Sequence, residues 1–142
     1  MARIKLTLPP TFSFSTQIPV RITDVNYGGH VGNDAILGLL HEIRMQFLKH
    51  YDYTEMDFSG VSLIMSDVAI EFKSELFYGD IITAYATATE LSRVGFDLYY
   101  KLIKTTGDKE IVIALAKTGM VCFDYATKKV TAVPENAKRI VT

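Results

Sequence analysis

The fold is decided by the stretch from Asn33 to His50, which reads NDAILGLLHEIRMQFLKH. Its apolar residues recur at steps of three and four, and one line of them contains Ile36, Leu40, Ile43 and Phe47. This spacing is typical of one face of an α-helix. Further leucines widen the apolar surface beyond a single stripe, which indicates burial. We therefore expect a long, mostly buried helix over residues 33–50, with Asn33 as its N-cap.

The segments on both sides of this helix change to a period of two, which is the signature of a β-strand. The predicted strands cover residues 12–23 before the helix and residues 61–72, 81–91, 96–104 and 110–125 after it. Turn signals separate the later strands, and short turns imply that successive strands pair antiparallel. A helix against one face of such a sheet predicts the α+β class.

The chain has 142 residues, which fits one domain over residues 1–142. The pair Pro9-Pro10 breaks regular structure, so residues 1–10 are expected to form an N-terminal arm, and residues 126–142 a polar tail. The net charge is −1 and no block of like charges is present. This pattern does not favour nucleic acid or an anionic membrane surface as a partner.

Two features bear on location. The longest apolar run, Ile111 to Ala116, is too short to span a bilayer, and the first residues lack the apolar core of a signal peptide. The single cysteine, Cys122, lies in an apolar run and cannot form an internal disulfide. We expect a cytoplasmic protein in which Cys122 is a small buried hydrophobic residue, rather than a nucleophile.

The loop that enters the helix, DVNYGGHVGND (Asp24 to Asp34), combines polar groups with three glycines. Glycine lets the backbone approach a ligand closely. The helix N-terminus adds unpaired N–H groups and a positive dipole end, which together can stabilise a developing oxyanion. The same loop could also be a glycine-rich connector before a capped helix, and the residues alone leave both interpretations open.

A second line of the helix, at the same helical spacing, contains Asp34, Gly38, His41 or Glu42, and Met45. Two carboxylates stand two turns apart on this line with a glycine between them. A glycine inside a helix costs about 1 kcal/mol relative to alanine, so close approach of a ligand or backbone is one explanation for Gly38. The alternative is that Asp34 complements the helix dipole and Glu42 is solvated. The three histidines lack standard ligand spacing, so we predict no metal site.

Two runs, TDVNYGGHVGNDAILGLLHEIR (Thr23 to Arg44) and SDVAIEFKSELFYGD (Ser66 to Asp80), resemble the hotdog-fold acyl-CoA thioesterases of the 4-hydroxybenzoyl-CoA thioesterase type. That family shows D-x-D-x-x-G-H-V-N-N at the start of its central helix, a Glu and an Arg further along, and a later turn before G-D. The resemblance implies an antiparallel sheet wrapped around one long central helix. It also implies a homodimer or homotetramer, acyl-CoA as substrate and no cofactor.

The motif assigns residues by resemblance. Its first Asp falls on Asp24, its G-H-V on Gly29, His30 and Val31, and its helical Glu and Arg on Glu42 and Arg44. The catalytic carboxylate of the family falls on Asn26, and an amide cannot act as nucleophile or base. Either Asp34 or Glu42 supplies the carboxylate, or the chain is not a hydrolase.

The expected reaction is hydrolysis of a small or medium acyl-CoA. Backbone N–H groups near Gly29 to Val31 would polarise the carbonyl, and Asn26 and His30 would hold the water or the carbonyl. Tyr27, Gly28 and Lys73 would contact the substrate, with Lys73 meeting CoA phosphates. The long strand Glu110–Tyr125, as a potential sheet edge, adds to the expectation of a dimer.

Two alternatives remain open. Hotdog enoyl-CoA hydratases carry D-x-N-P-[IL]-H-x-D, and this chain has Asp24, Asn26, His30 and Asp34 in that order. It has one extra residue before the His, however, and lacks the Pro. The other alternative is a non-catalytic acyl-CoA-binding module, which the amide at position 26 favours.

Overall fold

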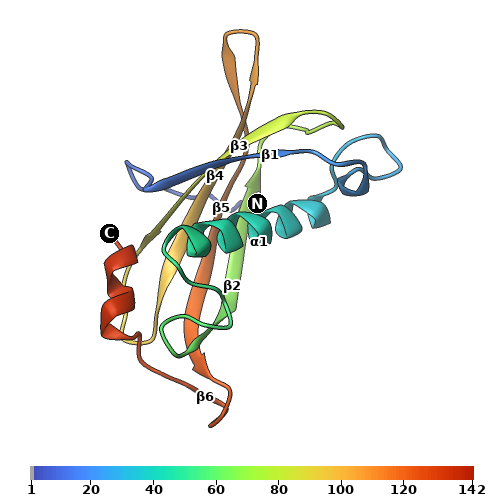
Figure 1. The fold of residues 1–142 in the computed structure, drawn as a ribbon. Helices are drawn as coiled ribbons and strands as arrows, with labels where there is room; N and C mark the ends of the chain where they lie inside the picture. The colour runs from blue at the N-terminus through green and yellow to red at the C-terminus, as the bar shows by residue number, and fades with distance from the viewer. Residues whose placement is uncertain (1) are drawn as a thin grey trace.

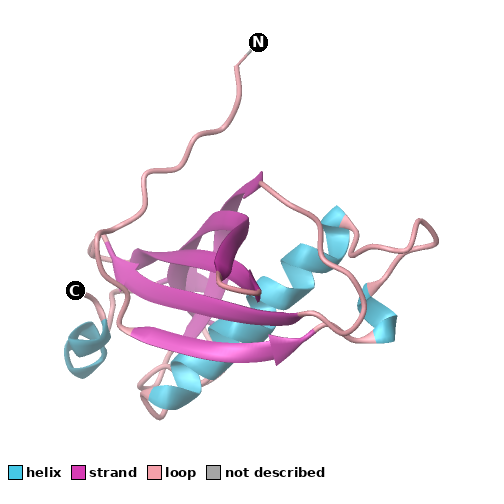
Figure 2. Ribbon diagram, turned by 90° about the horizontal axis from the view of Figure 1, so that it is seen from above, coloured by secondary structure: helices cyan, strands magenta, loops and turns pink. Residues whose placement is uncertain are grey.

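One antiparallel sheet wraps around one long helix in the computed structural model, which describes residues 2–142 (Figure 1). In chain order, the elements are β1 (Phe14–Pro19), η1 (Ile22–Asp24), α1 (Asn33–His50), β2 (Ser62–Phe72), β3 (Ile81–Thr89), β4 (Gly95–Thr106), β5 (Lys109–Asp124), β6 (Lys129–Val130) and η2 (Glu135–Ile140). Figure 2 shows the helix lying across the curved strands. The predicted α+β hotdog class is confirmed.

Helix α1 has the predicted bounds and buries its predicted apolar line, Ile36, Leu40, Ile43 and Phe47. The sheet positions that face it include fully buried alanines on β3 and β5, namely Ala84, Ala86, Ala88, Ala114 and Ala116. Small residues on the sheet leave room for large residues on the helix, which is how a core reaches close packing.

The predicted N-cap is wrong by one residue. Gly32 is the N-cap, with extended φ of −73° and ψ of 159°, and Asn33 is the first helical residue. A Cβ placed on Gly32 would lie 2.6 Å from Asp34 Oδ1, so a larger residue at the cap would displace the Asp34 side chain. Glycine is acceptable at this position because the cap tolerates it almost as well as a polar residue.

The strand order is β1-β3-β4-β5-β2, with β6 paired to β5. Successive strands are neighbours from β3 to β5, but β2 pairs with β5 rather than with β3. The connection over residues 73–80 crosses the end of the sheet, which it can do because extended chain covers about 3.3 Å per residue. The predicted edge strand 110–125 is therefore wrong: β5 is internal, and β1 and β2 are the edges.

The two predicted terminal segments differ in outcome. Residues 2–10 have no regular structure, as expected of an arm. The C-terminal segment is not a polar tail, because η2 buries Ala137 and Ile140, and Thr142 N–H donates to the Ala88 carbonyl at 2.9 Å. The apolar residues at 133, 137 and 140 were the signal for this docking, since they are spaced as on a helical face.

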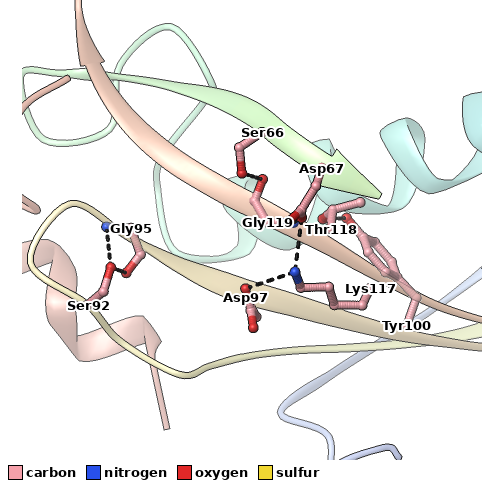
Figure 3. Close-up of polar contacts among 9 residues, drawn as sticks. All are labelled: Ser66, Asp67, Ser92, Gly95, Asp97, Tyr100, Lys117, Thr118 and Gly119. Atoms are coloured by element: carbon pink, nitrogen blue, oxygen red, sulfur yellow. Dashed lines mark hydrogen bonds and ion pairs between the residues drawn. The ribbon is translucent and has the colours of Figure 1, made fainter. Parts of the chain in front are cut away.

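The outer face of the sheet carries an ionic cluster beside a bulge in β2 between Met65 and Asp67 (Figure 3). The Asp67 carboxylate accepts the Gly119 N–H and the Lys117 ammonium, each at 2.9 Å. The hydrogen bond from Lys117 lowers the pKa of Asp67, which keeps the carboxylate ionised. The cluster therefore satisfies a backbone donor at the bulge and ties β2 to β5.

Two further observations bear on the sequence predictions. Cys122 is 0% exposed, and burial raises the pKa of its thiol to about 11, as expected of a buried hydrophobic residue. Within residues 2–142, no helix has the length and apolar character needed to cross a membrane.

Candidate active site

The loop before α1 is a tight hairpin held together by Asn26. Its backbone N–H donates to the His30 carbonyl at 2.9 Å, and its carbonyl accepts the Gly29 N–H at 3.0 Å. Its side-chain Oδ1 accepts the Gly28 N–H at 2.9 Å. Gly29 has a φ of +87°, which favours glycine at this position. Asn26 thus uses its oxygen for the turn, and its Nδ2 is the group left to face a ligand.

The side chains of Asn26, His30 and Asp34 lie around two of the three glycines of this loop, Gly28 and Gly32. A Cβ on Gly32 would lie within 3.4 Å of both Asn26 Nδ2 and Asp34 Oδ1, so the amide and the carboxylate flank the helix N-terminus. His30 Nδ1 lies 3.2 Å from the Val31 carbonyl oxygen. Because a carbonyl only accepts, Nδ1 is the donor in this contact, and Nε2 lies beside Gly28.

The predicted oxyanion donors are not available at two positions. The Gly29 N–H is used inside the loop, and the Val31 N–H donates to the Leu76 carbonyl at 2.9 Å. Within residues 2–142 the His30 N–H donates to no other protein atom, and neither do the N–H groups of Asn33 and Asp34 at the start of α1. Orphan donors at a helix N-terminus suit a developing negative charge.

A pocket of about 220 Å³ opens beside Asn33, the first residue of α1. Its lining comes from the loop and helix (His30, Val31, Asn33 and Ile36), from the end of β2 and its connection (Phe72, Lys73, Ser74, Glu75 and Leu76), and from Ile113 of β5. Lys73 lies on this lining and pairs with Glu71 at 3.0 Å. Tyr27, by contrast, is fully exposed and is not part of the pocket.

Asp24 lies apart from this group. Its carboxylate is buried and accepts the Arg21 backbone N–H at 2.9 Å and the Arg21 guanidinium at 3.1 Å. Burial by itself would raise the pKa of Asp24, but the hydrogen bonds from Arg21 outweigh it and lower the pKa. Asp24 is therefore an ionised partner of Arg21 that caps η1.

Glu42 also lies apart, two turns along α1. Its Oε2 accepts a hydrogen bond from Gln46 Nε2 at 2.7 Å. It lines a separate hollow of about 210 Å³ with Arg21 and Gly38, and it borders an open groove of about 780 Å³ along β1. The structure thus brings together Asn26, His30 and Asp34, and separates them from the other two predicted carboxylates.

Sequence reasoning missed most of the pocket wall. Phe72, Ser74 and Leu76 lie inside the second run that resembles the family, but only Lys73 of that run was predicted to contact the substrate, and Ile113 lies outside both runs. Only the order of strands, which places β2 beside β5, brings Phe72 and Ile113 together. In the part of the chain that the structure describes, no three His, Cys, Asp or Glu residues are grouped so as to hold a metal ion.

Comparisons with known proteins identify the family of the chain. The family model described as the thioesterase-like superfamily matches residues 20–141. A 1,4-dihydroxy-2-naphthoyl-CoA hydrolase from Microcystis aeruginosa is 31% identical over 122 residues, covering 84% of this chain and 86% of the relative.

Two solved structures share the fold. The 1,4-dihydroxy-2-naphthoyl-CoA thioesterase from Synechocystis has a TM-score of 0.76 at 21% identity, covering 86% of this chain and 90% of that chain. A 4-hydroxybenzoyl-CoA thioesterase, an aspartate-to-asparagine variant in complex with 4-hydroxybenzoyl-CoA, has a TM-score of 0.80 at 16% identity, covering 91% and 98%. The family match spans most of the sequence, and the chain belongs to the thioesterase-like superfamily as a hotdog-fold thioester hydrolase.

Proposed function

We propose that the chain hydrolyses the thioester of a small or medium acyl-CoA at the N-terminus of α1, with Asp34 as the catalytic carboxylate. The observation that supports this proposal is the meeting of three features around Gly32. These are the Asp34 carboxylate, the Asn26 amide and the N–H groups of the first helical turn, whose first residue, Asn33, lines the pocket together with His30.

In this proposal the thioester carbonyl accepts hydrogen bonds from the Asn33 and Asp34 N–H groups, so that the helix dipole stabilises the oxyanion. Asp34 removes a proton from a water molecule, which attacks the carbonyl carbon. Asn26 Nδ2 and His30 Nε2 orient that water. The tetrahedral intermediate then expels the CoA sulfur, which takes the proton from Asp34 and leaves as the free thiol.

The pocket favours a compact acyl group. A volume of about 220 Å³ suits a short aliphatic chain or an aromatic ring better than a long chain. The relatives named above act on aromatic acyl-CoA thioesters, which supports the same size class. Lys73, on the pocket lining, is proposed to meet a CoA phosphate.

A thiol-release assay across acyl-CoA substrates tests the proposal. We expect release of CoA from aromatic and short-chain thioesters, with weaker activity as the acyl chain lengthens. Enoyl-CoA substrates serve as a control, because hydration adds water without releasing thiol. Binding of acyl-CoA with no thiol release from any substrate would contradict the proposal.

That contradictory outcome would favour a non-catalytic acyl-CoA-binding module. Asn26, in place of the family carboxylate, is the residue that supports this second candidate. The 4-hydroxybenzoyl-CoA complex above was likewise obtained with an asparagine in place of an aspartate. The hydratase alternative is less favoured, because it requires Asp24 to act with His30 and Asp24 is held by Arg21.

We also propose that the chain is a homodimer, or a tetramer of two such dimers, that pairs through β2. This edge strand exposes apolar side chains, with Met65, Val68 and Phe72 at 38%, 39% and 48% exposure. An uncovered apolar edge favours association. Phe72 also lines the pocket, so a second copy at β2 would lie beside the site. We place the protein in the cytoplasm as part of this proposal, because its one cysteine is free.

Light scattering at micromolar concentration is expected to show at least a dimer for the wild type. The Val68→Glu variant is expected to be a monomer in the same measurement. The charge would sit in the apolar edge of each copy, where pairing would desolvate it. A matched Thr105→Glu change on the exposed β4–β5 hairpin should leave the mass unchanged. A monomeric wild type would rule out the proposed assembly.

A further inference from the structure

One wall of the pocket is not part of any strand or helix. Residues 73–76 belong to the connection between β2 and β3, and they line the pocket with Phe72. Leu76 is 1% exposed, and its carbonyl accepts the Val31 N–H at 2.9 Å. At the start of the connection, the N–H groups of Lys73 and Ser74 both donate to the Ile113 carbonyl, at 2.8 and 3.2 Å. The wall is therefore attached by backbone hydrogen bonds to β5 and, through Val31, to the loop before α1.

The far half of this connection is held by Lys104 of β4. Its ammonium donates to the Glu75 carbonyl at 3.1 Å and to Asp80 Oδ2 at 3.0 Å, and it lies 5.1 Å from the centre of the Phe77 ring. The Lys104 side chain is only 13% exposed. One cation thus joins a backbone oxygen next to the pocket to a carboxylate at the end of the connection.

Asp80 is itself fixed in place. Its carboxylate accepts the Phe77 N–H at 2.9 Å, and its carbonyl accepts the Val20 N–H at 2.8 Å. Burial alone would raise the pKa of Asp80, but the Phe77 N–H and Lys104 lower it, so the carboxylate stays ionised at neutral pH. Gly79, which precedes it, has a φ of +89° that favours glycine. The Gly79-Asp80 pair, which sequence analysis marked only as a turn, is therefore the anchor for Lys104.

We propose that Lys104 is a positioning residue that sets the shape of the acyl pocket by holding the connection 75–80 in place. Lys104 does not line the pocket and acts through the Glu75 carbonyl and Asp80. The inference rests on the proposed function, because it takes this pocket as the acyl site. Without the cation, the Glu75 carbonyl loses its partner and the wall from Ser74 to Leu76 gains freedom. The loop before α1 keeps its own hydrogen bonds, so the variant should affect the chemical step less than the binding of substrate.

The test compares Lys104→Met with Lys104→Arg and with a matched control, Lys101→Met. Lys101 lies on the same strand, and within residues 2–142 it forms no ion pair. We expect Lys104→Met to raise KM for the preferred acyl-CoA about ten-fold while kcat changes less than about three-fold. It should also reduce the preference for compact acyl groups over longer ones. Lys104→Arg should restore most of the wild-type KM, and Lys101→Met should match wild type.

Two further measurements keep this test separate from folding and from the proposed function. Circular dichroism checks that each variant is folded. The dissociation constant of a non-hydrolysable acyl-CoA thioether, measured by calorimetry, should rise about ten-fold for Lys104→Met even if the wild type shows no turnover. An Asp80→Asn variant should weaken binding similarly, and the double variant little further, because both changes break one contact. Equal KM and dissociation constants for Lys104→Met and Lys101→Met would overturn the proposal, as would a loss confined to kcat.

Discussion

The variant Asp34→Asn is expected to release CoA from acyl-CoA about 10²-fold or more slowly than the wild type while remaining folded. The change keeps the shape of the side chain but removes its charge and its ability to take a proton. Loss of a general base typically costs this much in kcat. Asp34 is exposed and contributes no buried ion pair, so the free energy of unfolding should change little, apart from a small loss at the helix dipole.

The matched control is Glu42→Gln on the same helix. Glu42 is hydrogen-bonded to Gln46 and borders a different hollow, so this variant should keep kcat within a few-fold of wild type. Thiol release by both variants, measured at saturating substrate, separates the two carboxylates. If Glu42→Gln loses activity and Asp34→Asn keeps it, the assignment must move two turns along the helix.

The reverse change, Asn26→Asp, restores the residue typical of the family. An aspartate can still accept the Gly28 N–H that holds the turn, so the loop should be preserved. The new carboxylate would also lie beside Asp34, and two like charges at one site raise a pKa. We expect activity that is equal to or higher than that of the wild type, with a pH profile shifted toward higher pH.

The central helix was predictable from the sequence because its pattern is local. Apolar residues at steps of three and four need only the helix itself to fall on one face, and α1 has the predicted bounds. The place of β2 was not predictable in this way. Whether β2 meets β3 or β5 depends on the path of residues 73–80 across the end of the sheet, and turn signals do not encode that path.

The candidate site shows the same contrast between residues that are close in sequence and residues that only the strand order brings together. Asn26, His30 and Asp34 lie within nine residues of one another at the entrance to α1, so their closeness could be expected from the sequence. The motif could not rank Asp34 above Glu42, because helical spacing puts both on one side of α1. The structure gives the two carboxylates different neighbours: Asp34 lies beside Gly32 and the Asn26 amide, whereas Glu42 is hydrogen-bonded to Gln46 and lines a separate hollow.

The family motif also placed an arginine on the helix at Arg44 without giving a reason for it. The guanidinium is buried, at 6% exposure, and its Nε donates to Glu55 Oε2 at 3.1 Å. A second nitrogen donates to the Tyr100 hydroxyl at 3.3 Å, which lies 2.8 Å from Thr118 Oγ1. Tyr100 and Thr118 are both 0% exposed, so this polar chain runs through the core between α1 and the sheet. Arg44 is therefore structural in the described protomer, rather than part of the pocket.

Replacing Arg44 with methionine is expected to lower the free energy of unfolding by about 3–5 kcal/mol, the usual cost of removing one partner of a buried ion pair. Methionine nearly matches the length of the aliphatic stem, so the loss comes from Glu55 and the Tyr100 hydroxyl rather than from a cavity. Glu55 keeps one partner, since His41 Nε2 lies 2.6 Å from its Oε1, which places the expected loss near 3 kcal/mol.

Urea unfolding followed by circular dichroism measures this loss, with the exposed Lys49→Met on the same helix as the control. The double variant Arg44→Met with Glu55→Gln removes the stranded charge and should recover part of the loss. A loss below about 1 kcal/mol for Arg44→Met would show that the buried chain contributes little to stability, whereas an equal loss in the double variant would place the cost on Tyr100 instead of Glu55.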